Sequence, residues 1–305
     1  MKRYCLYLFI LIGISCSAEL KAQKNGTVYK GNDPAVRYTG RTLVSPDGSV
    51  AFDWVGTYLE TRFTGGKLSV KVSETGTSYY NVFVDGKLHK VVKVCGTDTL
   101  IHLVSGIDKR IHSLKIQKRS EGEFGKTTVH QFVLSGSGRL AKEPAVRTRH
   151  IEFIGNSLTC GYGTDGKHRD EPFLVETENC NLTFASMVAR YYDADYTLIA
   201  HSGRGAARNY GDSVRVSKVT MKDRMLNTFD EDLTHKWNFK EYRPDLVVIN
   251  LGSNDFSTEP HPYKSEFTKA YKQILAQLRE HYGDIPILCI YPVASRLLYS
   301  VIMKR

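Results

Sequence analysis

The first half of the chain alternates apolar and polar residues with a period of two. The alternation is clearest over residues 58–63, 68–72 and 80–84, and Asp85-Gly86 then separates 81–84 from a further alternating run at 88–92. An Asp-Gly pair between two such runs predicts a tight β-hairpin. Three more short runs predict strands at 100–104, 111–116 and 131–134. Many short strands joined by glycine-rich turns, without a long amphipathic helix, favour a β-sandwich or barrel.

The second half alternates apolar strands with helices. Its strand-like runs are nearly continuous in apolar residues, which is typical of a parallel sheet covered on both faces. Helical spacing marks the segments between them, and Gly283 ends the last one. The predicted strands are 151–154, 196–200, 246–251 and 285–291, and the predicted helices are 182–192 and 265–282.

A turn-rich and then charged stretch over 135–149 separates the two patterns. We place the boundary near residue 145, with a β-sandwich domain over 24–144 and an α/β domain over 146–305. Together they predict an α/β fold class in which the sandwich is followed by a doubly wound parallel-sheet domain.

The first 22 residues have the pattern of a secretory signal peptide. Lys2 and Arg3 precede an apolar run that ends at Cys16 and is too short for a typical membrane-spanning helix. Cleavage after Ala18 or Ala22 fits the small-residue preference. A lipoprotein anchored through Cys16 is the weaker alternative. We therefore expect a protein that is secreted, periplasmic or at the cell surface, without stable membrane insertion after signal removal.

The formal net charge of +10 does not by itself indicate nucleic-acid binding, because the Lys and Arg residues are scattered along the chain. Four cysteines remain beyond the signal: Cys95, Cys160, Cys180 and Cys289. Export permits a Cys160–Cys180 disulfide, but two buried free thiols fit the spacing equally well. No CxxC pair or histidine-rich cluster indicates a metal site.

Three polar loops follow three separate strands of the second half. Ser157, Gly203 and Asn254 each come directly after an apolar run. Such loops gather at the carboxyl edge of a parallel sheet, where active sites lie. Ser157 can act as an acyl-transfer nucleophile, and its own N–H, the Gly203 N–H and the Asn254 amide can form an oxyanion hole. We expect Asp255 to orient its loop. Each loop alone is a common turn, and only their order and placement favour a hydrolase.

The extended motifs around these residues resemble SGNH-type hydrolases, and more closely the acetyl-xylan-esterase-like carbohydrate esterase family 2. Asn156 stands where the SGNH pattern usually has Asp. The resemblance covers nearly all of the chain beyond the signal and also implies an N-terminal jelly-roll sandwich. Its stretches are Ile154-Gly155-Asn156-Ser157-Leu158-Thr159-Cys160-Gly161-Tyr162-Gly163, Thr177-Glu178-Asn179, Ser202-Gly203-Arg204-Gly205, Arg208-Asn209-Tyr210-Gly211, Trp237-Asn238-Phe239 and Pro244–Gly252, followed by Gly252-Ser253-Asn254-Asp255.

The resemblance implies an exported esterase that removes O-acetyl groups from a polysaccharide such as xylan or mannan. It implies no metal and no organic cofactor. Tyr162, Tyr210 and Trp237 are candidates for stacking on sugar rings, although packing within the protein is the simpler interpretation of Trp237.

The resemblance also places a catalytic histidine, in an Asp-x-x-His or Asp-x-His element, after the last parallel strands. Residues 293–305 contain no histidine. We therefore expect a C-terminally incomplete hydrolase domain that is nearly inactive as it stands, since loss of the base costs about 10⁶ in turnover in a well-studied serine hydrolase. His261 and His201 are the candidate replacement bases, and neither stands where the family places its own.

Two other function classes remain. A non-catalytic carbohydrate-binding protein is favoured by the missing histidine but not by the retained Ser157, Gly203 and Asn254. A lipase or thioesterase is weaker, because a sandwich domain and polar, aromatic loops suit sugars better than acyl chains.

Overall fold

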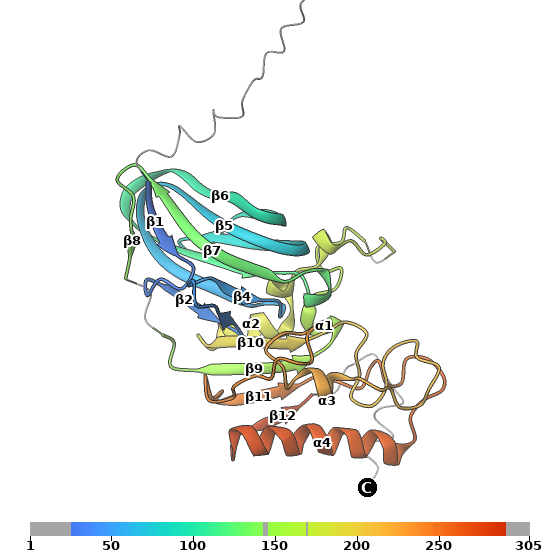
Figure 1. Cartoon of the computed structure of the whole chain (residues 1–305). Helices are drawn as coiled ribbons and strands as arrows, with labels where there is room; N and C mark the ends of the chain where they lie inside the picture. The colour runs from blue at the N-terminus through green and yellow to red at the C-terminus, as the bar shows by residue number, and fades with distance from the viewer. Residues whose placement is uncertain (1–25, 143–145, 169, 291–305) are drawn as a thin grey trace, which may run out of the picture.

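The computed structural model describes residues 26–142, 146–168 and 170–290. The predicted signal peptide and the tail at 291–305 lie outside these residues. The antiparallel part, with the sheet order β2-β5-β7-β4-β3, lies above a separate parallel sheet (Figure 1). Its strands are β1 (Gly26–Lys30), β2 (Val36–Thr39), β3 (Leu43–Val44), β4 (Val50–Phe52), β5 (Tyr58–Val84), β6 (Lys87–Lys118), β7 (Thr127–Ser135) and β8 (Leu140–Ala141).

The predicted hairpin at Asp85-Gly86 is confirmed. Asp85 and Gly86 have φ values of 49° and 75°, and Val84 pairs with Lys87. The short strands predicted on either side are in fact parts of the two long strands β5 and β6. Their apparent breaks are irregularities in pairing, such as the register shift at Gly66 (φ 85°), because a glycine inside a strand can form a bulge as well as a turn.

A single apolar core fills the antiparallel part. β5 pairs with both β6 and β7, and the inward-facing residues of all three strands meet. Phe63, Leu68 and Phe132 are fully buried there. The predicted class of this half, a jelly-roll-like sandwich, is confirmed.

The second part is a parallel sheet with the order β10-β9-β11-β12. β9 (His150–Gly155) lies centrally, between β10 (Asp195–Ala200) and β11 (Leu246–Ile249), and β12 (Ile287–Cys289) pairs with β11. The helices are α1 (Ser157–Cys160), α2 (Phe184–Tyr191), α3 (Met221–Arg224) and α4 (Lys264–Tyr282), and the short 3-10 segments are η2 (Gly122–Phe124), η3 (Val175–Thr177) and η4 (Cys180–Leu182).

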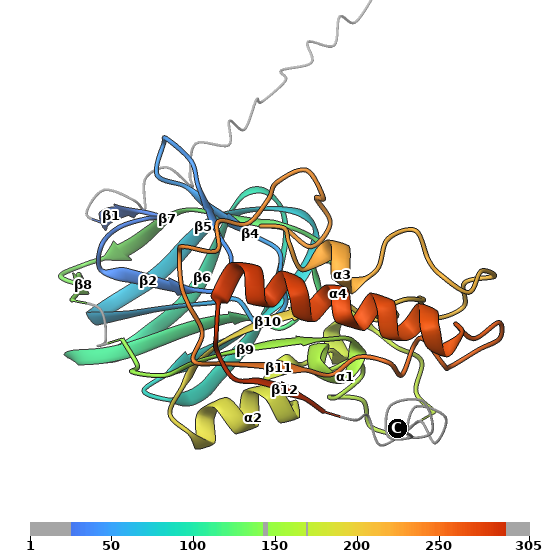
Figure 2. The same ribbon diagram turned by 90° about the horizontal axis from the view of Figure 1, so that it is seen from below.

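Helices cover both faces of the parallel sheet, as its nearly continuous apolar strands predict. Ile154 and Ile249 pack with α4 in one cluster, whereas Phe153 and Val248 pack with α2 in another. Figure 2 shows α4 and α2 on opposite sides of the strands. The doubly wound arrangement is confirmed. Among the described residues, no helix is both long and apolar enough to span a bilayer.

The two parts share a buried interface. Trp54 and Tyr58, from the antiparallel part, pack into the clusters around the parallel sheet. The Tyr58 hydroxyl donates to Asp195 of β10 at 2.7 Å, and Arg37 pairs with the same carboxylate at 2.7 Å. The sandwich is thus packed directly against the sheet that carries the predicted site.

Candidate active site at the carboxyl ends of the strands

The three loops singled out from the sequence all leave the same edge of the parallel sheet. α1 follows β9, the 201–205 loop follows β10, and the 250–255 loop follows β11. β10 and β11 both pair with β9 in parallel, so these loops are neighbours in space. The structure therefore brings Ser157, Gly203 and Asn254 to one edge. The roles expected for them are not tested by this placement.

Ser157 is the first residue of α1, at a tight turn from β9. The Asn156 side chain caps this helix by accepting from the Leu158 N–H, and its amide donates to Ser253 Oγ at 3.0 Å. The second bond joins the turn at Ser157 to the loop that carries Asn254. Gly155 is required by space, because a Cβ there would lie 2.0 Å from Thr159 Oγ1.

Gly203 lies in an open part of its loop and has a φ of 75°, a backbone conformation that favours glycine. Its carbonyl accepts from the Tyr210 N–H at 2.8 Å. The Asn254 amide donates to the Arg204 carbonyl at 2.8 Å and still carries a second hydrogen. Gly203 and Asn254 therefore belong to loops that are directly bonded to each other.

Asp255 orients the loops, as expected. It is fully buried, and its carboxylate accepts from the backbone N–H groups of Ala206, Ala207 and Arg208 at 3.0, 2.6 and 2.9 Å. Burial raises the pKa of Asp255, while these backbone donors act in the opposite direction. The residue after Asn254 thus fixes the segment that follows Gly203.

His201 is the buried histidine of this edge. Its Nδ1 lies 2.7 Å from the buried Asp230 carboxylate, and its Nε2 lies 3.6 Å from Glu123 Oε2. Burial alone would lower its pKa, but the charge and hydrogen bond of Asp230 outweigh burial and raise it. His261, the other candidate base, is paired with Glu259 at 3.1 Å. Within the described residues, neither histidine hydrogen-bonds the Ser157 hydroxyl.

A second buried group was missed from the sequence. Glu121 and Glu178 are both fully buried, and Cys160 of α1 lies beside them. Glu121 accepts from the N–H and hydroxyl of Ser202, directly before Gly203. No local pattern marks Glu121 as buried. Glu178 and Cys160 both lie in stretches that carry the family resemblance, but nothing in the sequence placed them beside Glu121.

These side chains include the donor types that bind divalent cations. Three groups have ligand atoms within 4.8 Å of one another: Glu121, Cys160 and Glu178; Glu121, Glu123 and His201; and His201, Asp230 and Glu231. Bonds within the protein already engage most of them, such as those from His201 and Arg224 to Asp230. Their geometry is explained by these bonds.

The cysteines do not form the disulfide that the spacing allowed. Cys160 and Cys180 are both free thiols and fully buried. Of the two alternatives left open, the structure has the buried thiols. Burial raises the pKa of both, so neither is a ready nucleophile.

The three aromatic candidates differ in exposure. Tyr162 is 48% exposed and stacks on Phe173 with ring centroids 3.8 Å apart, while Tyr210 is 61% exposed and follows the Gly203 loop. Trp237 is only 8% exposed, which agrees with packing within the protein, the simpler of the two interpretations given from the sequence. It packs against Tyr242 and the Arg41 guanidinium, so its large ring fills space instead of facing solvent.

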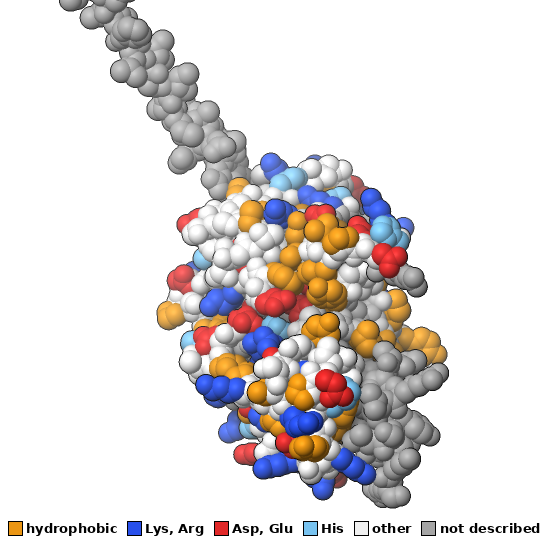
Figure 3. Space-filling model, turned by 90° about the vertical axis from the view of Figure 1, so that its right-hand side faces the viewer, with side chains coloured by type: hydrophobic (Ala, Val, Ile, Leu, Met, Phe, Trp, Pro, Cys, Tyr) orange, Lys and Arg blue, Asp and Glu red, His pale blue; other side chains and the backbone are white. Residues whose placement is uncertain are grey.

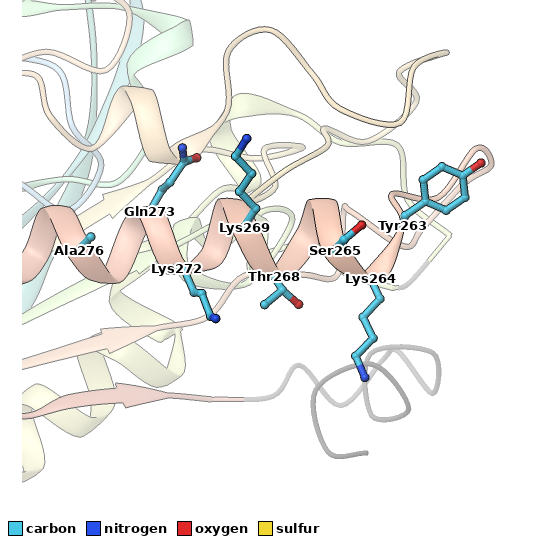
Figure 4. A pocket seen from close by; sticks show the side chains of 8 residues that line it. All are labelled: Tyr263, Lys264, Ser265, Thr268, Lys269, Lys272, Gln273 and Ala276. Atoms are coloured by element: carbon cyan, nitrogen blue, oxygen red, sulfur yellow. The ribbon is translucent and has the colours of Figure 1, made fainter. Parts of the chain in front are cut away.

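Two of the hollows in the described surface are relevant to the location of the site. One follows the outer side of α4 and contains none of the predicted site residues (Figure 4). The other, of about 310 Å³, lies between the two parts of the chain, where Glu123 and Glu231 line it together with Phe124 and Phe229. Figure 3 views the side on which α1 lies in Figure 1, and acidic and hydrophobic side chains lie close together on it. The second hollow adjoins His201 through Glu123.

Comparison with known families gives two matches. The family described as "Carbohydrate esterase 2 N-terminal" matches residues 38–144, and the "GDSL-like Lipase/Acylhydrolase family" matches residues 153–301. The structure of a family two carbohydrate esterase from Clostridium thermocellum in complex with cellohexaose has a TM-score of 0.82 and 33% sequence identity. That match covers 88% of this chain and 82% of the other.

Curated relatives agree with these matches. The chain is 34% identical over 258 residues to "Cellulase/esterase CelE" of Acetivibrio thermocellus, which covers 85% of this chain and 31% of the relative. It is 33% identical over 226 residues to an "Acetylxylan esterase / glucomannan deacetylase" of Cellvibrio japonicus, which covers 72% of this chain and 61% of the relative. The chain thus spans less than two thirds of the length of either relative.

Proposed function

We propose that this chain, which belongs to carbohydrate esterase family 2, is an exported esterase that removes O-acetyl groups from xylan- or mannan-type polysaccharide. One observation carries the proposal. Ser157, Gly203 and Asn254 leave three adjacent parallel strands in loops that are bonded to one another through Asn156–Ser253 and Asn254–Arg204. Relatives with the printed activities of acetylxylan esterase and glucomannan deacetylase support the substrate class.

The proposed reaction is acyl transfer. Ser157 Oγ attacks the acetyl carbonyl carbon, and the carbonyl oxygen becomes an oxyanion that accepts from the Ser157 and Gly203 N–H groups and the Asn254 amide. The ester C–O bond then breaks, the sugar hydroxyl leaves with a proton, and water releases acetate from the acylated serine. No described residue hydrogen-bonds Ser157 Oγ as a base, so we assign that proton transfer to none of them.

Substrate contact is proposed for the two exposed tyrosines. Tyr162 and Tyr210 flank the predicted nucleophile and the glycine loop in sequence, and both rings have solvent-facing surface. An aromatic ring offers an apolar face with a polar edge, which suits the face of a sugar ring. Trp237 is not part of this proposal.

Acetate release tests the esterase function. The assay uses 4-nitrophenyl acetate and acetylated xylan with the chain from residue 23, beside Ser157→Ala and a matched control, Ser265→Ala, on the outer side of α4. We expect the parent and the control to release acetate only slowly, because no described residue acts as a base at Ser157, but still faster than Ser157→Ala. Equal rates from the parent and Ser157→Ala would contradict the proposed role of Ser157. Where turnover is present, His261 and His201 variants identify a base.

A non-catalytic carbohydrate-binding function is the second candidate. It is favoured by the lack of a base bonded to Ser157 among the described residues. The relevant measurement is titration calorimetry with deacetylated xylan and mannan oligosaccharides. Binding that Tyr210→Ala weakens and Ser157→Ala preserves, without any acetate release by the parent, would support this function over the esterase.

A further inference from the structure

Glu121 reaches from the antiparallel part of the chain into the predicted oxyanion loop. It lies between β6 and η2 and is fully buried, although it carries a carboxylate. Both of its oxygens accept from one residue: Oε2 from the Ser202 N–H and Oε1 from the Ser202 hydroxyl. Ser202 immediately precedes Gly203. A buried carboxylate with two charge-assisted bonds to one residue holds that residue firmly.

Glu121 is itself fixed from behind. Its N–H donates to Glu178 Oε2 at 2.9 Å, and its carbonyl accepts from Lys118 Nζ at 3.0 Å. Arg119 Nε donates to the Glu178 carbonyl at 2.6 Å, which ties the two segments together. The Glu121 carboxylate therefore has little freedom to follow Ser202 if the loop moves.

The same group also touches the segment that carries the nucleophile. The Cys160 thiol of α1 and the carboxylates of Glu121 and Glu178 lie within 4.8 Å of one another. Burial first, and then the neighbouring Glu121 carboxylate, raise the pKa of Glu178 well above its usual range. The Glu121 carboxylate thus lies between α1 and the Gly203 loop and is bonded to Ser202.

We propose that Glu121 is a positioning residue that sets the direction of the Gly203 N–H. That N–H belongs to the peptide group that joins Ser202 to Gly203, so its direction follows the backbone of Ser202. Gly203 has no side chain to restrain it and adopts a left-handed conformation, which makes an external restraint necessary. This inference rests on the proposed function for its catalytic meaning. The restraint on the loop can be measured without turnover.

Amide hydrogen exchange tests the restraint. Glu121→Ala is compared with Glu74→Ala, which removes another buried carboxylate of the antiparallel part, one that contacts Thr127 instead of Ser202. In Glu121→Ala we expect exchange at the Ser202 N–H, which loses its acceptor, to become at least about tenfold faster, with β7 unchanged. Glu74→Ala should show the reverse pattern. Glu121→Gln keeps one side-chain oxygen as an acceptor, and Ser202→Ala keeps the backbone N–H as a donor. The exchange rates of both variants should therefore fall between those of the parent and of Glu121→Ala.

Two outcomes would overturn the inference. One is unchanged exchange at the Ser202 N–H in Glu121→Ala. The other is an increase that is equal in β7 and in the loop, since this would mean that Glu121 supports the fold as a whole and not the loop.

The kinetic measurement separates this inference from the proposed function. Where the parent releases acetate, Glu121→Ala should lower kcat by about 10²-fold, the usual effect of losing one oxyanion donor, with KM nearly unchanged. A raised KM at constant kcat would contradict positioning. Where the parent releases no more acetate than Ser157→Ala, the esterase proposal fails, and the exchange measurement still decides the role of Glu121.

Discussion

Replacement of Asp255 by alanine should destabilise the parallel-sheet part strongly. The carboxylate is fully buried and accepts from three backbone N–H groups, at Ala206, Ala207 and Arg208. A buried N–H that loses its acceptor costs about 1–3 kcal/mol. Three such losses, partly offset by removal of a buried charge, give an expected decrease of about 3–6 kcal/mol in the free energy of unfolding.

Asp255→Asn gives a graded comparison. Ala207 and Arg208 both donate to Oδ1, whereas Ala206 donates to Oδ2. An asparagine oriented with its oxygen at the Oδ1 position keeps two of the bonds and places an NH₂ against the Ala206 N–H. The expected cost is therefore that of one bond, about 1–3 kcal/mol.

Urea unfolding followed by tryptophan fluorescence measures both effects. The two tryptophans, Trp54 and Trp237, are buried in or beside the parallel-sheet part, so they report on the affected region. Asp284→Ala, at an exposed aspartate after α4, is the control and should change the free energy by less than about 0.5 kcal/mol. A loss below about 1 kcal/mol in Asp255→Ala, or an equal loss in Asp255→Asn, would refute the bond-by-bond argument.

Three further predictions concern residues of the site and its surroundings. Gly155→Ala should cost about 1–3 kcal/mol in chemical denaturation, since its Cβ would lie 2.0 Å from Thr159 Oγ1; wild-type stability would contradict this clash. Burial and the Asp230 charge raise the pKa of Asp53 from 3.8 to about 7. The protonated form of Asp53 therefore favours the folded state, and this contribution is full below about pH 4 and is lost as the pH rises through about 7. Asp53→Asn should flatten the plot of unfolding free energy against pH between these values. An unchanged slope would count against the raised pKa. Trp237→Ala should lower the free energy of unfolding by about 3–5 kcal/mol without weakening oligosaccharide binding. Tyr210→Ala should weaken oligosaccharide binding and leave the free energy of unfolding nearly unchanged. Titration calorimetry measures the binding of each variant, and chemical denaturation measures its stability.

Local patterns were enough to predict most of the fold. The Asp85-Gly86 hairpin and the helix that ends before Gly283 depend on neighbouring residues, and both are confirmed. The resemblance to carbohydrate esterase family 2, drawn from the motifs, is confirmed as well. The strand boundaries around Gly66 were wrong because a bulge and a turn use the same residue type, and only pairing with a partner strand distinguishes them.

The location of the candidate site was predictable for a general reason. In a parallel sheet, loops after successive strands meet at one edge, so Ser157, Gly203 and Asn254 could be placed together from strand order alone. The surrounding charged residues could not. Glu121 is 81 residues before Ser202, and Asp230 is 29 residues after His201. Charged residues are rarely buried, and nothing local marks the few that are. The partner that Trp237 packs against, Arg41, also comes from a distant segment and could not be named from the sequence.

These distant contacts change how the antiparallel part should be understood. A sandwich that only tethered sugar would need few charged contacts with its neighbour, yet it sends Arg37 and Arg41 to buried carboxylates of the parallel sheet, at Asp195 and Glu152. Removing one partner of a buried ion pair costs about 3–5 kcal/mol, a large share of the stability of a typical domain. Glu121 adds a contact at the candidate site itself. The sandwich and the parallel sheet therefore form one structural unit, because the sheet without the sandwich would keep buried charges that have lost their partners.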